Sequence, residues 1–220
     1  MPFKIAGRGR VKMRVERREM QILDQAQQRA FIRAARGNRL EALWVIALAS
    51  GMREGEILGL RWAHIKGDHV AVLGRLDARR KAAAQTKTRA SVRHIDLDPQ
   101  TMRRLEAHRR RMSAEGHDTG PRDLVFVNTA GKAISASNLT TREFKPLLTK
   151  AGLPESVRFH DLRHSHATLL LSLRMNPRDV QARLGHESVR TTLDLYVHHL
   201  PKAGREAATL VGGVLFGKSP

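Results

Sequence analysis

The sequence has no cysteine and a single tyrosine, and aromatic residues make up only 4% of it. The lack of cysteine excludes disulfides, thiolate nucleophiles and zinc sites built on cysteine. The few aromatic side chains leave little surface on which the bases of a single-stranded nucleic acid could stack. No apolar run is long enough to span a bilayer, and no signal-peptide core follows the basic N-terminus, so a cytoplasmic location is expected. A Walker loop and a dinucleotide fingerprint are also missing.

Acidic residues are scarce beside basic ones. The chain carries 40 Lys and Arg against 21 Asp and Glu, which gives a formal net charge of +19. So large an excess predicts a polyanionic partner, of which nucleic acid is the commonest. With 220 residues the chain can bury the core of one ordinary domain.

Three short motifs gather chemically capable side chains near the C-terminal end: RFHDLRHSHAT at residues 158–168, RLGHES at residues 183–188 and YVHH at residues 196–199. His160 and Arg163 are three residues apart, so a helix starting here places both on one face. Asn176 with the following proline predicts the start of a second helix, and Gly185 predicts its end. His186 therefore lies just beyond a helix end, and a further helix from near residue 188 would carry Tyr196 back to the same neighbourhood.

An arginine, two histidines and a phenol suit chemistry on a phosphodiester. A guanidinium matches two phosphate oxygens, imidazoles move protons near neutral pH, and a phenol can act as a nucleophile. Each residue taken alone has a plainer interpretation, because a lone tyrosine in an apolar helix usually belongs to a core or an interface. The combination favours a catalytic site.

HDLRH, then LGH, then a tyrosine resembles the tyrosine recombinase (phage integrase) family, which has a His-x-x-Arg box, a Leu-Gly-His box and a tyrosine that forms a 3′-phosphotyrosyl bond with DNA. Two upstream stretches fit the same pattern: SGMREGEILGLRW at residues 50–62 and QTKTRASVRHIDL at residues 85–97. The first resembles the box of the first catalytic arginine, which maps to Arg53, with its supporting acidic residue at Glu56. The second resembles the hairpin of the catalytic lysine, which maps to Lys87. Lys81 competes for that role but lacks the Thr-Lys-Thr surroundings.

The resemblance implies a division of proton transfers among three of these residues. Tyr196 attacks the scissile phosphorus and keeps the bond energy in a phosphotyrosine. Its phenol has an ordinary pKa near about 10 and needs a base or a cationic surrounding, and His160 is the expected proton acceptor. Lys87 would protonate the leaving 5′ oxygen.

The other matched residues are expected to bind the phosphate. Arg53 and Arg163 would hold its two non-bridging oxygens and neutralise charge in the pentacovalent state. His186 would donate a further hydrogen bond, and Glu56 would orient this cationic set. No cofactor and no metal ion are expected: helical spacing sends His164 and His166 in different directions, and no well-placed third ligand accompanies them.

The expected fold is α+β and mainly α-helical, an integrase-type catalytic domain with a small antiparallel β-sheet on one edge. Periodicity and caps predict helices over residues 19–36, 40–49, 54–60 and 99–114, a helix capped by Ser137 or Asn138 that runs to Lys150, and a C-terminal apolar segment over residues 202–216. Residues 69–73, 92–97 and 123–127 are predicted to be strands, residues 128–132 a turn, and residues 74–91 a basic hairpin or loop that reaches towards DNA.

Two segments are expected. Residues 1–18 are predicted to be a basic flexible arm or linker, and residues 19–220 the tyrosine recombinase catalytic domain. In related integrases such a linker follows an N-terminal core-binding domain, which we expect to be absent here.

The partner expected from the charge and the resemblance is double-stranded DNA that carries an attachment or recombination site. Contacts in or beside its major groove are expected from Arg142, Lys145 and Lys150, whereas the HRRR run at residues 108–111 is predicted to be a solvated or backbone-binding face. The resemblance also implies a homo-tetramer on DNA, with the C-terminal segment docked on a neighbouring protomer, a monomer free in solution, and a place for accessory DNA-bending factors.

Three other functions remain open from the sequence. A type IB topoisomerase uses nearly the same residues to nick and reseal one strand. An integrase-derived DNA-binding regulator would keep the fold without catalysis. A basic structural or RNA-binding protein has only the charge in its favour.

Overall fold

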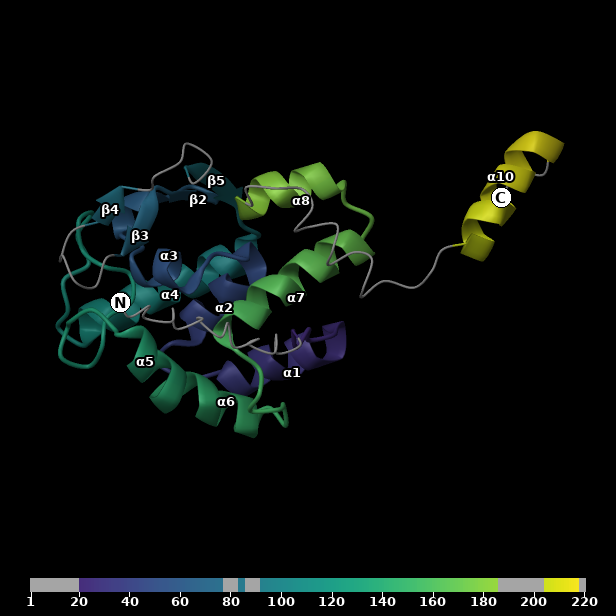
Figure 1. Cartoon of the computed structure of the whole chain (residues 1–220). Coiled ribbons are helices and arrows are strands. Elements are labelled where there is room, and N and C mark those ends of the chain that lie inside the picture. Colours follow the sequence, from purple (N-terminus) through teal and green to yellow (C-terminus); the bar gives the residue numbers. More distant parts are fainter. Residues whose placement is uncertain (1–19, 77–82, 86–91, 186–203, 218–220) are drawn as a thin grey trace, which may run out of the picture.

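The computed structural model describes residues 20–76, 83–85, 92–185 and 204–217, and Figure 1 shows a helical body with a small sheet along one edge. The helices are α1 (Gln25–Ala35), α2 (Glu41–Ser50), α3 (Glu54–Leu58), η1 (Trp62–His64), α4 (Pro99–Ala114), α5 (Ala136–Asn138), the π-helix η3 (Leu139–Phe144), α6 (Lys145–Lys150), α7 (Phe159–Ser172), α8 (Pro177–Leu184) and α10 (Gly204–Phe216). The strands are β1 (Ile65–Lys66), β2 (His69–Val72), β3 (Gly74–Leu76), β4 (Ala83–Gln85) and β5 (Arg93–Asp96). The predicted fold class, mainly α-helical with a small antiparallel sheet, is confirmed.

The sheet is built from strands that pair in antiparallel fashion in the order β1-β2-β5. Val70 faces Ile95 across β2 and β5, and both are fully buried. A separate hairpin pairs β3 with β4, which confirms the predicted hairpin for the described part of residues 74–91. Residues 123–127 were predicted to be a strand, but they make only isolated bridges, such as the one between Arg61 and Leu124.

The core is centred on α2, whose side chains are buried nearly all round. Trp44 of α2 stacks on Phe144 at a centroid distance of 5.6 Å, and Phe31 of α1 meets Trp44 edge-on at 5.9 Å. Phe159 at the start of α7 joins the same aromatic cluster. These contacts pack α1, η3 and α7 around α2, and they fix the direction in which α7 presents its first turn.

Helix boundaries follow local caps where the sequence carries them. The helix over residues 99–114 was predicted with the bounds found for α4, which the Asp98 side chain caps. Asn176, Pro177 and Gly185 bound α8 as predicted. Within the described part of the chain, no helix is both long and apolar enough to cross a membrane.

Several predicted details were wrong. Residues 20–24 are not helical, because Asp24 caps α1 through the backbone N–H of Gln27. The helix start near residue 137 lies earlier, since the side chain of Ser135 caps α5. α3 ends at Leu58, before Leu60. His108 of the HRRR run is not solvated: it is 4% exposed and its Nε2 lies 2.8 Å from the carbonyl oxygen of Val125.

Candidate active site

Two helix ends meet at the candidate site. Gly51 caps the C-terminus of α2 and Gly185 that of α8, and both glycines take the left-handed conformation that closes a helix. The last carbonyl groups of a helix lack partners within it and carry the negative end of its dipole. The pair of C-termini therefore forms a place that attracts cations.

Arg163 fills this place from α7. Its side chain is almost fully buried, with Nη1 donating to the carbonyl oxygen of Gly51 and Nη2 to that of Leu184, both at 2.7 Å. Its Nε is buried and has no hydrogen-bond partner among the described residues. Burial, helped by the charge of Arg53, lowers the pKa of Arg163 to about 9, so the group stays charged at neutral pH. A buried cation with an unused donor is a suitable partner for an anion.

Arg53 and Glu56 form the second part of the site. Arg53 is the N-cap of α3, and its Nη1 donates to Oε1 of Glu56 at 3.0 Å while its Nη2 donates to the carbonyl oxygen of Gly185 at 3.0 Å. A third of the Arg53 side chain is exposed, whereas that of Glu56 is buried. Arg53 thus remains open to a ligand while the carboxylate behind it fixes its direction.

The buried carboxylate of Glu56 also binds Arg93, a residue that the sequence analysis missed. Arg93 Nη1 and Nη2 donate to Oε1 and Oε2 of Glu56 at 3.1 and 2.9 Å. Burial alone raises the pKa of Glu56, but the hydrogen bonds and charges of Arg93 and Arg53 outweigh it and lower that pKa. The sequence did carry a sign that Arg93 is buried. In a strand over residues 93–96, side chains alternate between the two faces, so Arg93 lies on the same buried face as Ile95.

His160 lies one turn before Arg163 on α7. The residue is partly exposed, and its ring meets that of His164 edge-on, with a centroid distance of 4.6 Å. Burial of the imidazole and the positive charges of Arg163, Arg53 and Arg158 lower the pKa of His160, against an opposing effect of Asp161. A histidine in this setting is neutral at neutral pH and can accept a proton.

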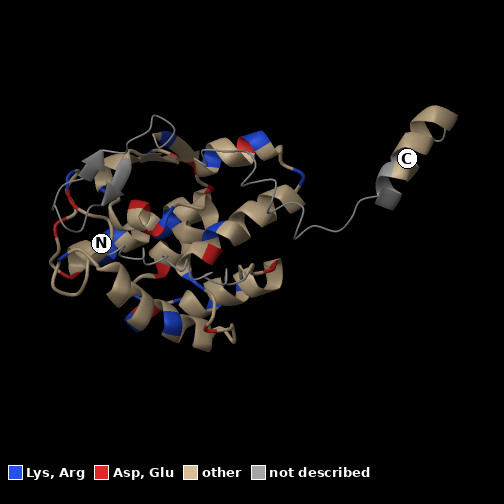
Figure 2. Cartoon of the chain, in the orientation of Figure 1, with Lys and Arg blue, Asp and Glu red and all other residues tan. Residues whose placement is uncertain are grey.

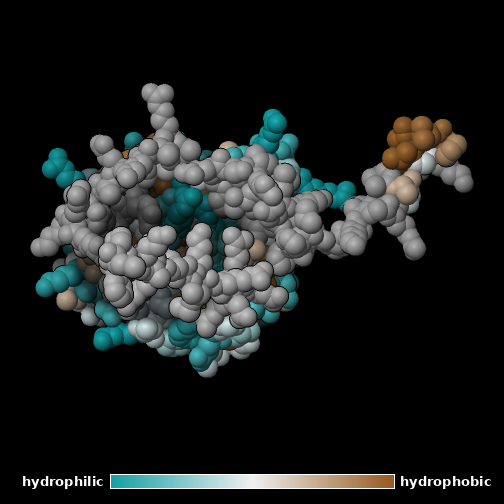
Figure 3. Space-filling model, viewed as in Figure 1, coloured by the Kyte–Doolittle hydropathy of each residue, from teal (hydrophilic) through white to brown (hydrophobic). Residues whose placement is uncertain are grey.

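The structure brings together four of the predicted residues, Arg53, Glu56, His160 and Arg163, from α3 and α7. Figure 2 shows basic residues in this central region and on α8, and Figure 3 shows hydrophilic side chains at the centre of the same face. The predicted Lys87, His186 and Tyr196 lie outside the described residues. The described chain leads to two of them: β4 ends at Gln85, and α8 is closed by Gly185.

The three residues predicted to contact DNA lie on η3 and α6. Arg142 and Lys150 are exposed. Lys145 is half-buried, and its Nζ donates to the carbonyl oxygens of Glu155 and Val157, the latter at 3.0 Å. These bonds tie the segment after α6 to the helix, so Lys145 has a structural task that Arg142 and Lys150 do not share.

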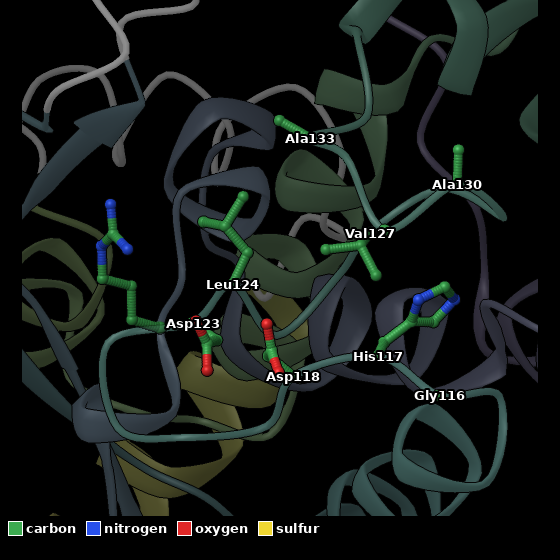
Figure 4. A pocket seen from close by; sticks show the side chains of 10 residues that line it. Gly116, His117, Asp118, Asp123, Leu124, Val127, Ala130 and Ala133 are labelled. Carbon is green, nitrogen blue, oxygen red and sulfur yellow. The ribbon is translucent and has the colours of Figure 1, made fainter.

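A separate pocket of about 550 Å³ lies beside the loop that follows α4 (Figure 4). It is lined by Arg61, Gly116, His117, Asp118, Asp123, Leu124, Val127, Ala130, Gly131 and Ala133. Part of its polar surface is used by the loop itself, because Asp123 accepts a hydrogen bond from the backbone of Gly120 at 2.8 Å. None of Arg53, Glu56, His160 and Arg163 lines it, so this pocket and the arginine cluster are different places.

Two buried histidines of α7 make the stability of the fold depend on pH. Burial lowers the pKa of His164 to about 4, helped by His160, and that of His166 to about 4, helped by Arg183. The unfolded chain, with an ordinary value of 6.5, then binds more protons than the fold between these two values. The contribution of each histidine to the free energy of unfolding should therefore be fully present above pH 6.5. It should fall by up to about 3 kcal/mol per histidine as the pH drops towards 4.

The variant His164→Leu should reduce this pH dependence, because it removes one of the two titrating groups together with a buried Nδ1 that has no partner among the described residues. Phe159→Leu, a buried and non-titrating position on the same helix, is the matched control and should keep the full dependence. Urea unfolding at several pH values measures the slope. Equal slopes for wild type and His164→Leu would contradict the assignment.

A sequence model of the phage integrase family matches residues 16–203. The chain belongs to this family. Over 189 residues it is 30% identical to a XerC-like tyrosine recombinase of Caldanaerobacter subterraneus subsp. tengcongensis, which covers 77% of this chain and 48% of that protein. Over 220 residues it is 27% identical to an integrase of Streptomyces ambofaciens, covering 92% of this chain and 55% of the relative. The chain thus spans about half the length of the curated relatives that it matches.

Solved structures show the same fold. The Tn1549 transposon integrase, solved in complex with transposon right end DNA, superposes with a TM-score of 0.72 at 23% identity, over 92% of this chain and 68% of that one. The XerA recombinase gives a TM-score of 0.70 at 24% identity, over 90% and 66%. These similarities agree with the mainly α-helical architecture.

Proposed function

We propose that this chain contains the catalytic part of a tyrosine recombinase, which cuts and rejoins DNA at a specific site through a covalent 3′-phosphotyrosyl intermediate on Tyr196. The observation that carries the proposal is the convergence of Arg53 and Arg163, from α3 and α7, on the meeting point of two helix ends, with His160 one turn away from Arg163. Two guanidinium groups can neutralise the charge that develops on a phosphodiester under in-line attack, and a neutral imidazole can accept the proton of the nucleophile.

The chemistry balances with the residues available. The phenol oxygen of Tyr196 forms a bond to phosphorus, its proton passes to His160, and the bond from phosphorus to the 5′ oxygen breaks. Lys87 supplies a proton to that leaving oxygen. Arg53 and Arg163 neutralise the charge that grows on the non-bridging oxygens, and His186 adds a hydrogen bond. Rejoining is the same sequence in reverse, so no external energy source is consumed.

The proton acceptor role of His160 gives a pH dependence. His160 accepts a proton only when it is neutral, and its lowered pKa keeps it neutral below its ordinary value of 6.5. The single-turnover rate of covalent complex formation should stay level around neutral pH and fall only below that value, about tenfold per pH unit. The variant His160→Gln should be slower and lack this acid limb. An acid limb that persists unchanged in the variant would assign it to another group.

The proposed partner is double-stranded DNA that carries an attachment or recombination site. A matching relative in Bacillus subtilis is named the ICEBs1 integrase, and the Tn1549 integrase was solved with transposon DNA. We therefore propose integration or excision of a phage or mobile element, in the cytoplasm, where bacterial DNA lies. Residues 1–18 would be a basic arm and residues 19–220 the catalytic domain, with Arg142 and Lys150 as the stronger candidates for DNA contacts.

α10 supports the proposed assembly of four chains on DNA. Its apolar side chains are exposed, with Val214 at 86% and Phe216 at 81%, and they gather on one helix that stands apart from the body (Figures 1 and 3). A contiguous apolar surface of this kind favours docking on another protein surface. Here the proposed surface is a neighbouring protomer, with the free protein a monomer. A chain truncated after residue 201 should then bind DNA without assembling on it.

Covalent trapping tests the function. Wild type and Tyr196→Phe are mixed with nicked duplexes whose sequence is randomised around the nick. Cleavage near the nick releases a short fragment, which prevents rejoining. Protein–DNA bands that resist denaturant then report the covalent complex. A band with wild type alone supports the proposal, and a band with both proteins contradicts it. Two alternatives have their own outcomes: processive relaxation of supercoiled plasmid without strand exchange would indicate a topoisomerase, and tight DNA binding without any band would indicate a regulator.

A further inference from the structure

Three successive carbonyl groups at the end of α8 are each held by a different arginine. Arg93 Nε donates to the carbonyl oxygen of Arg183 at 2.8 Å, Arg163 Nη2 to that of Leu184 at 2.7 Å, and Arg53 Nη2 to that of Gly185 at 3.0 Å. Arg163 and Arg53 have proposed catalytic roles. Arg93 has none, although it is the one of the three that also binds a carboxylate with both Nη groups.

The position of Arg93 in the chain connects the separate parts of the site. It begins β5, six residues after Lys87. Its fork holds Glu56, which in turn accepts from both the side chain and the backbone N–H of Arg53. Its Nε holds the last turn of α8, two residues before Gly185 and the chain that leads to His186. One buried guanidinium therefore joins the sheet, the start of α3 and the end of α8.

We propose that Arg93 is a positioning residue, which sets the relative places of Arg53 and the end of α8 for attack on the scissile phosphate. This inference rests on the proposed function. It does not require Arg93 to touch DNA, and its side chain, 7% exposed and engaged on both sides, is placed to act through its neighbours.

Arginine suits this position and lysine does not. A planar guanidinium presents donors in fixed directions, so that two meet the oxygens of one carboxylate while a third points to a carbonyl group on another element. A single ammonium cannot reach Oε1 and Oε2 of Glu56 and the carbonyl oxygen of Arg183 together. The variant Arg93→Lys keeps the positive charge but removes the fixed arrangement of donors. It therefore tests the placement of the hydrogen bonds and not the charge.

Arg39 provides a matched control. Like Arg93 it binds a carboxylate, with Nε donating to Glu115 at 2.7 Å, and it also donates to backbone carbonyl groups, among them that of Asn128. Its partners lie in the last turn of α4, just after that helix and in the following loop, away from α3, β5 and α8. Arg39→Lys should therefore cost stability through the same kind of lost bonds without changing the site.

The test compares the 220-residue wild-type chain, Arg93→Lys and Arg39→Lys on one nicked duplex recovered from the randomised pool by trapping with wild type. We expect Arg93→Lys to bind this duplex within about threefold of wild type and to form the covalent complex about 30- to 100-fold more slowly, since small misplacements of reacting groups have effects of this size. Arg39→Lys should react within about twofold of wild type. A folded Arg93→Lys that reacts as fast as wild type, or that loses binding and reaction in equal measure, would overturn the inference.

A double variant tests whether Arg93 acts through Glu56. In a Glu56→Gln background, the added change Arg93→Lys should slow the reaction by no more than about threefold, because the shared link is already broken. If the two substitutions instead slowed the reaction independently, so that their rate factors multiplied, the inference would be contradicted.

If Arg93→Lys does not fold, Arg93→Met with Glu56→Leu removes the buried pair as a whole and is expected to fold. A wild-type rate in that folded protein would also overturn the inference.

Amide hydrogen exchange of the protein without DNA tests the positioning role of Arg93 independently of the proposed recombinase activity. Arg93→Lys should speed amide exchange at residues 53–58 and at the end of α8, and leave α4 unchanged, whereas Arg39→Lys should do the reverse. No covalent complex with wild type would defeat the proposed function alone. Unchanged exchange at α3 and α8 in Arg93→Lys would defeat the positioning role whatever the reaction shows.

Discussion

Replacing Arg163 with lysine is expected to slow covalent complex formation by about 10²- to 10³-fold, the usual effect of removing one preorganised donor from a developing oxyanion. The ammonium of lysine cannot bind the carbonyl oxygens of Gly51 and Leu184 together and still face a phosphate, whereas the guanidinium does the first and keeps a buried Nε without a partner among the described residues. Both helix ends should loosen as well, because their carbonyl groups lose a charged partner.

Arg158→Lys is the control for this change. Arg158 is the N-cap of the same helix and pairs with Asp161 at 3.0 Å, but its side chain is about half exposed. Asp161 is buried, but lysine keeps a positive charge beside it, and the variant should react within about threefold of wild type. Single-turnover trapping at saturating protein measures both rates. Similar losses in the two variants would mean that general positive charge, and not the placement of Arg163, is what matters.

The variant Gly51→Ala is expected to lower the free energy of unfolding by about 3 kcal/mol and to remove most of the cleavage activity. Gly51 has φ of +63°, and a Cβ there would lie 2.6 Å from carbon atoms of both His166 and Leu184. The substitution therefore combines backbone strain with a clash against two elements of the site. Movement to relieve the clash would displace the carbonyl group that accepts a hydrogen bond from Arg163.

Gly67→Ala separates the two causes. Gly67 has a similar φ of +57°, but nothing lies within 4 Å of an added Cβ. It should cost only the strain of the left-handed conformation, about 1 kcal/mol, and leave the reaction unchanged. Urea unfolding of the two variants gives the comparison. Equal losses of stability would contradict this prediction, because they would show that the side chains of His166 and Leu184 move aside at little cost.

Elements with strong local signals could be predicted from the sequence, and those decided by distant contacts could not. α4 and α8 carry an Asp or Asn cap, a proline in the first turn and, for α8, a closing glycine, and their bounds were predicted correctly. The start of α1 is an exception: a local signal, the capping box of Asp24 and Gln27, sets it, and it was predicted too early. Leu23 continues the apolar pattern, yet its backbone N–H donates to Ser165 of α7 at 2.9 Å, a contact between residues 142 positions apart.

The turn before α6 shows a second limit. Ser137 or Asn138 was predicted as the cap of one regular helix, but Ser135 caps α5 and a π-helix follows. Pro146 in the first turn of α6 has no N–H to donate to the preceding turn, which favours a local widening before it. The preference of a residue for a cap position does not reveal how a proline further along the chain changes the helical turns between the cap and the proline.

The residues of the site also fall into those that short motifs predict and those that only the folded chain reveals. Arg53, Glu56, His160 and Arg163 were predicted from short motifs, and the structure brings them together. Arg93 lies within one of those motifs but was treated only as part of a strand. Its partners, Glu56 and the carbonyl oxygen of Arg183, are 37 and 90 residues away, so only the folded chain shows that it joins them.

The measurement that tests the central claim most directly is the chemical identity of the attachment to DNA. Trapped wild-type complex is digested with protease and nuclease, and the peptide that retains a nucleotide is sequenced by mass spectrometry. The account predicts a 3′-phosphate linked to Tyr196, the only tyrosine in the chain, by an acid-stable ester. A nucleotide on any other side chain, or an acid-labile bond of the kind that histidine forms, would contradict it.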